Sequence, residues 1–94
     1  MPTSRAEVRT ETPARYAKQL ASHMGRKIDA TWDGASGVLP FSFGTCALSA
    51  GTGVLVLDAD AATEEDLARV EDVAGRHLER FGQRNELTVT WART

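Results

Sequence analysis

The sequence predicts an α+β fold of two layers, in which a curved, mostly antiparallel sheet carries two helices on one face. Two segments have apolar residues at the spacing of helices, and several shorter segments alternate between apolar and polar residues. The glycine-containing stretches between the alternating segments are short enough for hairpin turns. Because each helix has one apolar stripe to bury, both pack most simply on the same side of the sheet. The expected order is β-α-β-β-β-β-α-β.

A strand and a helix are expected in the N-terminal third. Residues 6–10 alternate weakly and are predicted to form the first strand. The helix is expected to begin at Thr12 and Pro13, since Thr is a good N-cap and Pro suits the first helical turn. Gly25 is expected to end it. The apolar stripe of this helix consists of Tyr16, Ala17, Leu20, Ala21 and Met24.

Four strands are expected between the two helices. They are predicted at residues 28–32, 38–43, 46–50 and 54–57. Near Gly44 the apolar positions shift by one residue, which predicts a bulge or a tight turn. The tract Gly51-Thr52-Gly53 predicts another hairpin turn, and the strand after it is apolar on both faces, as in a central strand.

A second helix and a final strand complete the prediction. Residues 63–66 resemble a capping box, and their three acidic residues suit the positive end of a helix dipole. The apolar stripe of this helix is Leu67, Val70, Ala74, Leu78 and Phe81. Gly82 is the expected stop, and residues 87–91 alternate as a last strand.

Length and composition describe one ordinary globular domain over residues 1–94, with 41% hydrophobic and 26% charged residues. The single cysteine and the absence of an apolar leader or spanning segment predict a reduced, cytoplasmic protein that has no contact with a membrane. The net charge of −2 combines six Lys/Arg against three Asp/Glu in residues 1–30 with five against ten in the rest. An acidic balance of this kind disfavours nucleic acid as a partner.

Several segments together resemble a bacterial family, domain of unknown function family 2218. The resembling pieces are residues 12–16, 18–20 and 23, the central residues 41–46, and residues 77–81, 84, 86–87 and 91. The resemblance implies no catalytic residues, because the family has no established activity. Similar domains occur joined to flavin-binding siderophore-interacting proteins, which implies a supporting role in bacterial iron uptake or release.

Basic residues on the two helices form the leading candidate site. The candidates are Arg15, Tyr16 and Lys18 on the first helix, with Arg26 and Lys27 just after it, and Arg76, Arg80 and Arg84 on the second, which extend the patch if the helices are adjacent. Arginine suits planar anions, so we expect a non-enzymatic binding or accessory module for an anionic small molecule or a protein partner. The competing interpretation is a solvated surface with ion pairs such as Asp72 with Arg76.

Two alternatives involve soft ligands. His23, His77 and Cys46 could bind a transition metal if a further ligand joined them, whereas the competing interpretation makes them boundary histidines and a buried cysteine. No other cofactor is predicted. A Cys46–His pair is the sharpest hypothesis for a small enzyme, but no complete catalytic motif is present, and Cys46 shares its apolar phase with core residues. The sequence therefore favours binding over catalysis, and the oligomeric state stays open.

Overall fold

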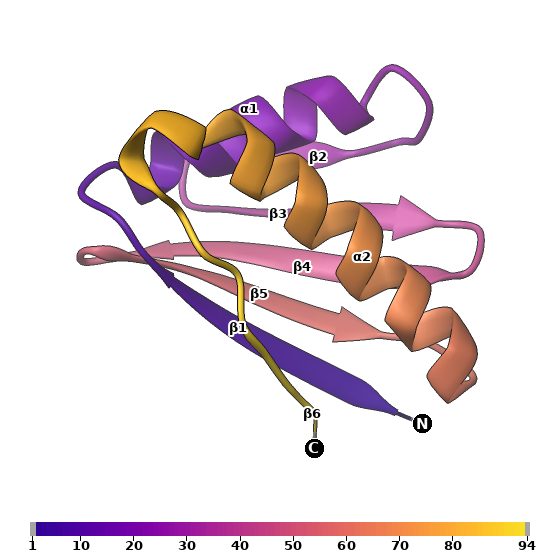
Figure 1. The fold of residues 1–94 in the computed structure, drawn as a ribbon. Helices are drawn as coiled ribbons and strands as arrows, with labels where there is room; N and C mark the ends of the chain where they lie inside the picture. The colour runs from indigo at the N-terminus through magenta and orange to yellow at the C-terminus, as the bar shows by residue number, and fades with distance from the viewer. Residues whose placement is uncertain (1, 94) are drawn as a thin grey trace.

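The computed structural model describes residues 2–93, apart from the side chain of Asn85, and shows an antiparallel sheet with two helices on one face (Figure 1). The predicted fold class and element order are confirmed. In chain order the elements are β1 (Thr3–Arg9), α1 (Pro13–Met24), β2 (Thr31–Trp32), β3 (Ser36–Phe41), β4 (Gly44–Gly51), β5 (Val54–Asp60), α2 (Glu64–Phe81), the 3-10 turn η1 (Gln83–Asn85) and β6 (Trp91–Arg93).

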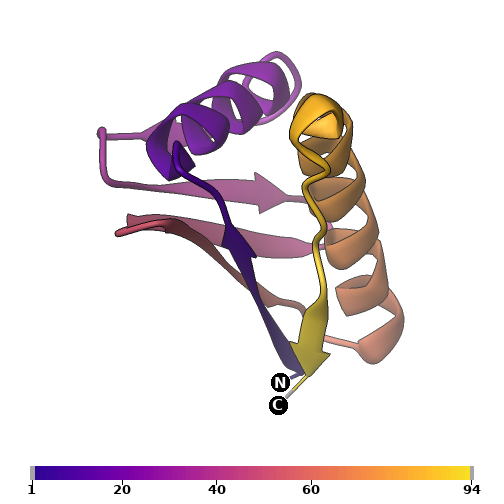
Figure 2. The same cartoon turned by 60° about the vertical axis from the view of Figure 1, so that its left-hand side comes forward.

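The six strands of the described chain lie in the order β2-β3-β4-β5-β1-β6. Three hairpin connections join β2 to β5 in sequence, and β1 then pairs with β5 so that Arg5 lies opposite Asp58. The last strand adds to the other edge of β1, where Ser4 lies opposite Arg93. The two ends of the chain therefore lie side by side (Figures 1 and 2).

The core lies between the helices and the face of the sheet that they cover (Figure 2). All five predicted stripe residues of α1 are buried, as are four of the five predicted for α2, and Phe81 is half-buried. The buried strand side chains are those of Ser4, Ala6, Val8, Leu39, Cys46, Leu48, Leu55, Leu57 and Ala59. They alternate along each strand with residues on the opposite face, which no helix covers.

The tight turn predicted at Gly44 is present, and no bulge interrupts β3 and β4. Ser42 and Phe43 form the turn, and Phe41 pairs directly with Gly44. A Cβ atom on Gly44 would lie 2.5 Å from the Asp60 carbonyl oxygen and 2.8 Å from Val70 Cγ2. Only glycine therefore allows this close approach of β4 to its neighbours.

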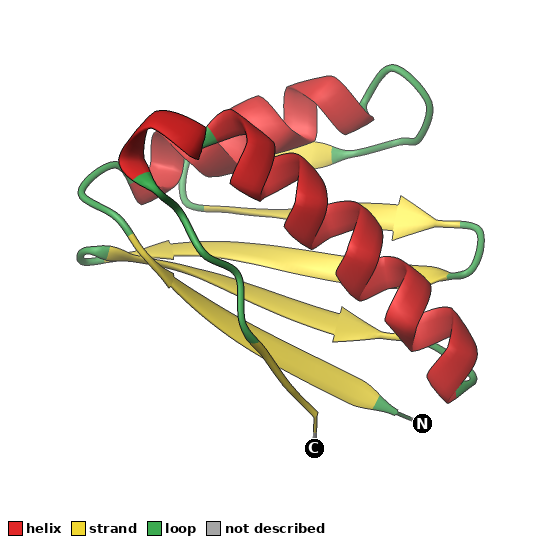
Figure 3. Ribbon diagram, viewed as in Figure 1, coloured by secondary structure: helices red, strands yellow, loops and turns green. Residues whose placement is uncertain are grey.

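All six predicted strands differ from the observed ones at one or both ends, and the differences in the first, second and last strands have a direct explanation (Figure 3). The first begins earlier, at Thr3, because pairing with β5 extends to Asp60. The second is reduced to Thr31–Trp32, since the amide of Ile28 donates to the Met24 carbonyl at the end of α1. The last is reduced to Trp91–Arg93, because the amide of Val89 donates to a Glu79 carboxylate oxygen.

Candidate functional site

A cleft of about 450 Å³ lies between the first half of α1 and the end of α2. The helices pass each other in opposite directions, because Arg15 shares this cleft with Arg84 while His23, two turns further along α1, meets His77. The residues that line the cleft are Thr12, Arg15, Tyr16, Gln19, Arg80, Phe81, Gln83 and Arg84.

Local structure explains how these side chains reach one place. Tyr16 is 7% exposed and anchors α1 in the core, so Arg15 and Gln19 lie at the border of the buried stripe. Gly82 ends α2, and a Cβ there would overlap the Leu87 side chain. After Gly82 the chain turns through η1 toward the start of α1. Arg84, just after the helix, therefore lines the same cleft as Arg80 on α2.

The cleft gathers positive charge without a compensating carboxylate. Among the described residues, the lining contains three arginines and no Asp or Glu. Within residues 2–93, the arginines at positions 5, 69, 76 and 93 each form an ion pair, whereas Arg15, Arg80 and Arg84 form none. These three guanidinium groups are therefore open to an external anion.

The structure brings four of the six predicted anion-binding residues into this cleft: Arg15, Tyr16, Arg80 and Arg84. Lys18 is exposed and lies outside the lining. Arg76 also lies outside the cleft: it lines a different, acidic hollow that contains Glu71 and Glu79. Its guanidinium forms an ion pair with Asp72 at 2.9 Å. The competing interpretation of an ion pair is thus correct for Arg76.

Sequence reasoning missed four members of this site: Thr12, which was identified only as a helix cap, and Gln19, Phe81 and Gln83. Gln19 follows Arg15 by one helical turn, so its position on the same face could have been inferred from spacing. Phe81 was identified only as a core residue. Gln83 depends on the path of the chain after α2, which has no local signal in the sequence.

The two histidines meet beside this cleft. Their ring centroids are 5.1 Å apart, and the ring of Phe81 lies 5.4 Å from His23 and 6.5 Å from His77. His77 Nδ1 lies 2.7 Å from the Val73 carbonyl oxygen, to which it donates as N–H. Desolvation lowers the pKa of His23, and the neighbouring His77, Arg26, Lys27 and Arg80 lower it further.

Cys46 does not join the histidines. It is 0% exposed on β4, and burial, with smaller contributions from Asp58 and Asp60, raises the pKa of its thiol to about 12. Among the residues that the structure describes, no group of three or more His, Cys, Asp or Glu side chains is placed to hold a metal ion. The geometry therefore supports neither the three-residue metal set nor a Cys–His nucleophile.

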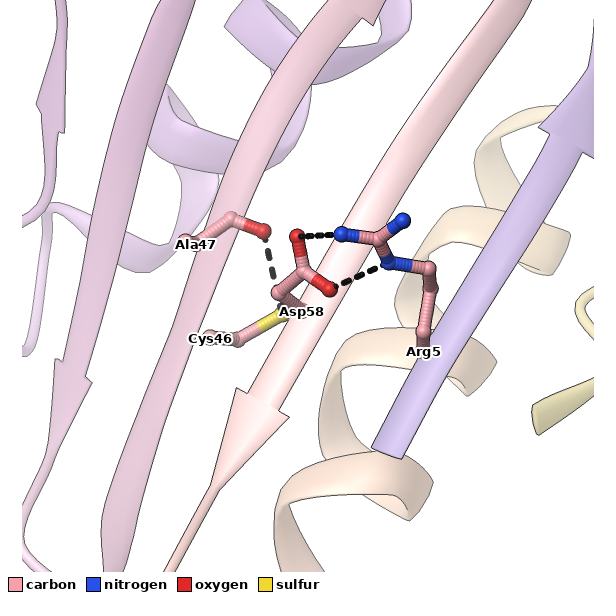
Figure 4. Close-up of polar contacts among 4 residues, drawn as sticks. All are labelled: Arg5, Cys46, Ala47 and Asp58. Atoms are coloured by element: carbon pink, nitrogen blue, oxygen red, sulfur yellow. Dashed lines mark hydrogen bonds and ion pairs between the residues drawn. The ribbon is translucent and has the colours of Figure 1, made fainter. Parts of the chain in front are cut away.

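A second hollow, of about 470 Å³, lies on the open face of the sheet. Its charged groups already have partners. Arg5 Nε donates to Asp58 at 2.7 Å (Figure 4). The Thr45 hydroxyl donates to Asp60 at 2.7 Å. The Cys46 thiol lies behind this surface, 4.0 Å from the Ala47 carbonyl oxygen. These satisfied pairs distinguish the hollow from the cleft between the helices.

Comparison with known proteins agrees with the observed fold. Residues 5–92 match the model of a family described as an uncharacterized protein conserved in bacteria (DUF2218). The chain is similar to the NMR structure of PA4090 from Pseudomonas aeruginosa, with 29% sequence identity, a TM-score of 0.82, and coverage of 98% of this chain and 96% of that chain. No curated protein matches. In residues 2–93, neither helix is long and apolar enough to cross a membrane.

Proposed function

On the premise that this chain belongs to the uncharacterized bacterial family DUF2218, we propose that it is a non-enzymatic binding module for a small anion with several negative charges. The ligand occupies the cleft between α1 and α2. The observation that carries this proposal is the convergence of Arg15, Arg80 and Arg84 without a carboxylate among the lining residues.

The chemistry of the lining supports an anion with planar oxygen groups. Guanidinium groups donate paired hydrogen bonds to carboxylates and phosphates, and the amides of Gln19 and Gln83 offer further donors. The aromatic rings of Tyr16 and Phe81 provide an apolar wall. A volume of about 450 Å³ lies in the range of small-molecule sites, which favours a small ligand over the flat surface of a protein partner.

Helix electrostatics alone account for only part of this arrangement. Arg80 lies in the last turn of α2, where a cation interacts favourably with the helix dipole without any ligand. Arg15 lies in the first turn of α1, where the same dipole disfavours a cation. The position of Arg15 is therefore better explained by an external anion than by the dipole.

The proposal includes a cellular context taken from the family resemblance. A siderophore or other chelate of ferric iron is an anion with several oxygen groups, which is the chemistry that the cleft fits. We place this role in the cytoplasm, and a single unpaired cysteine is compatible with that compartment.

The first test is an amide NMR titration with citrate and with inorganic phosphate. We expect saturable shifts at the start of α1, the end of α2 and η1. Arg15→Gln, Arg80→Gln and Arg84→Gln should each weaken binding by about 10- to 100-fold, since a hydrogen bond to a charged group contributes about 1.5–3 kcal/mol. Arg76→Gln is the matched control and should bind as the wild type does, because Arg76 already pairs with Asp72.

Equal weakening by Arg76→Gln would show a diffuse charge effect and would overturn the assignment of the cleft. An absence of shifts with both anions would reject a small anionic ligand and favour a protein partner. The iron context has its own test, in which gallium(III) citrate replaces ferric citrate as a diamagnetic stand-in. If the protein binds gallium(III) citrate no more tightly than citrate alone, the proposed role in iron handling is rejected.

A further inference from the structure

His23 and His77, the two histidines of the sequence, lie on different helices and meet across the contact between them. His23 is exposed near the end of α1, and His77 is half-buried in the second half of α2. Neither residue lines the arginine cleft, although Phe81 contacts both histidines and also lines the cleft. The pair is therefore a separate feature of the contact between α1 and α2.

The separation of the rings matches that of two imidazoles on one metal ion. A ligating nitrogen lies about 2.0–2.1 Å from the metal, and the ring radius adds about 1.1 Å, so each centroid lies about 3.2 Å from the ion. Two such rings are about 5.2 Å apart at a tetrahedral angle and about 4.5 Å apart at a right angle. The observed distance is 5.1 Å, so the spacing of the two rings allows both to bind one ion once a nitrogen of each ring is turned toward it.

The hydrogen bonding of His77 also fits a metal ligand. Its Nδ1–H donates to the Val73 carbonyl oxygen, which leaves Nε2 with a free electron pair. Metal-bound histidines ordinarily donate their other N–H to a backbone carbonyl or a carboxylate, because this fixes the tautomer and the ring orientation.

The surrounding groups restrict the type of ion. The described residues supply two imidazoles and neither a thiolate nor a carboxylate as a third ligand, and this donor set suits Cu(II), Ni(II) or Zn(II) better than the harder Mg(II) or Ca(II). The positive charges of Arg26, Lys27 and Arg80 act on His23 and oppose a bare cation. The remaining coordination positions are therefore better filled by anions or hydroxide than by neutral water.

We infer that His23 and His77 form a two-histidine site for a borderline transition-metal ion, Cu(II) above all, that bridges α1 and α2. The metal keeps open positions for ligands from outside the chain. This inference is independent of the proposed anion-binding function, because it uses none of the three cleft arginines as a ligand.

The experiment is a titration of the protein with Cu(II), followed by electron paramagnetic resonance. Pulsed measurements should detect two equatorial imidazole nitrogens at one equivalent of metal. His23→Gln and His77→Gln should each lower the affinity at least about tenfold, the smallest loss seen even for outer partners of metal-bound histidines. Ser22→Ala, an exposed change beside His23, is the control and should leave the affinity unchanged.

A thermal measurement tests the bridging geometry separately. A metal that binds both helices should raise the melting temperature of the wild type, because it binds the folded chain more tightly than the unfolded one. Neither single variant should show this increase. Since His23 is exposed, His23→Gln keeps the test valid even if His77→Gln destabilises the fold. One imidazole per copper, or equal affinity in wild type and His23→Gln, would overturn the inference and leave the rings as a packing contact with Phe81.

Discussion

At the scale of single residues, the role of each charged side chain depends on whether a partner of opposite charge lies near it. Arg76 and Arg80 are separated by one turn of α2. Asp72 neutralises Arg76, whereas Arg80 faces the cleft without an ion pair among the described residues. Two arginines that look equivalent in the sequence therefore differ in their availability to a ligand.

Cys46 provides a prediction at the same scale. Its thiol has a pKa of about 12 against an ordinary value of 9.0, so the reactive thiolate is about a thousandfold less populated at neutral pH. Burial beneath the helices also blocks access. We expect a chromogenic disulfide reagent at pH 8 to label the folded protein at least about a thousandfold more slowly than the protein in urea. Comparable rates in the two conditions would contradict the buried position of this cysteine.

At the scale of elements, the two helices begin in chemically different ways. Both are preceded by threonine. Thr63 Oγ1 accepts a hydrogen bond from the Asp66 amide at 3.1 Å, and three acidic residues follow in the first turn of α2. Thr12 makes no side-chain cap, and the first turn of α1 contains no acidic residue. The predicted helix start at Thr12 and Pro13 is confirmed, but the capping role expected for Thr12 is wrong.

This contrast provides a matched pair of variants. Thr63→Ala should lower the free energy of unfolding by about 0.5–2 kcal/mol, the usual cost of removing a threonine cap. Thr12→Ala should have a clearly smaller effect, because no capping bond is lost. Urea unfolding followed by circular dichroism measures both. A larger loss for Thr12→Ala would mean that the cap geometry described for α1 is incorrect.

At the scale of the whole molecule, contacts between distant segments connect the helical layer to the edge of the sheet. Glu71 on α2 accepts hydrogen bonds from Arg93 on β6, with a shortest distance of 2.9 Å. The Glu71 side chain is 14% exposed. Its partial burial opposes the charged form, but the hydrogen bond and charge of Arg93, with a contribution from the Ser4 hydroxyl, outweigh this effect, and the pKa of Glu71 is lowered from 4.5. The short β6 is held in part through this ion pair.

The lowered pKa of Glu71 has a defined sign for stability. Because the folded chain holds this carboxyl deprotonated more strongly than the unfolded chain does, the contribution is fully present above pH 4.5 and is lost as the pH falls through the lower folded pKa. Glu71→Gln should therefore lower the free energy of unfolding by about 0.5–1 kcal/mol at pH 7. The difference from the wild type should shrink toward zero as the pH falls below the folded pKa of Glu71.

Chemical denaturation at a series of pH values measures this effect. Asp72→Asn is a suitable control, because Asp72 pairs with Arg76 within α2 and does not connect it to β6. An equal loss for Glu71→Gln at pH 7 and at a pH below the folded pKa of Glu71 would show that size or packing, rather than charge, is responsible for the change.

Local patterns in the sequence account for most of the fold. The two apolar stripes, the stop at Gly25 and the turns at Gly44 and Gly51-Thr52-Gly53 depend on a few neighbouring residues, and all of them are present in the structure. The alternation of apolar and polar residues predicted strands wrongly where other contacts hold the chain. Residues 28–30 continue from the end of α1, and residues 87–90 pack beside α2 without forming strand pairs.

The candidate site was likewise predicted in part from the sequence and in part decided by the tertiary structure. Residue type and helical spacing were enough to select the arginines and both histidines, because charge and ligand chemistry belong to each side chain on its own. Only the tertiary structure decided that Arg15 meets Arg80 and Arg84, that Arg76 is paired, and that His23 meets His77 while Cys46 lies elsewhere. The physical reason is that these relationships depend on how two helices lie across one sheet, and packing between distant segments sets that arrangement.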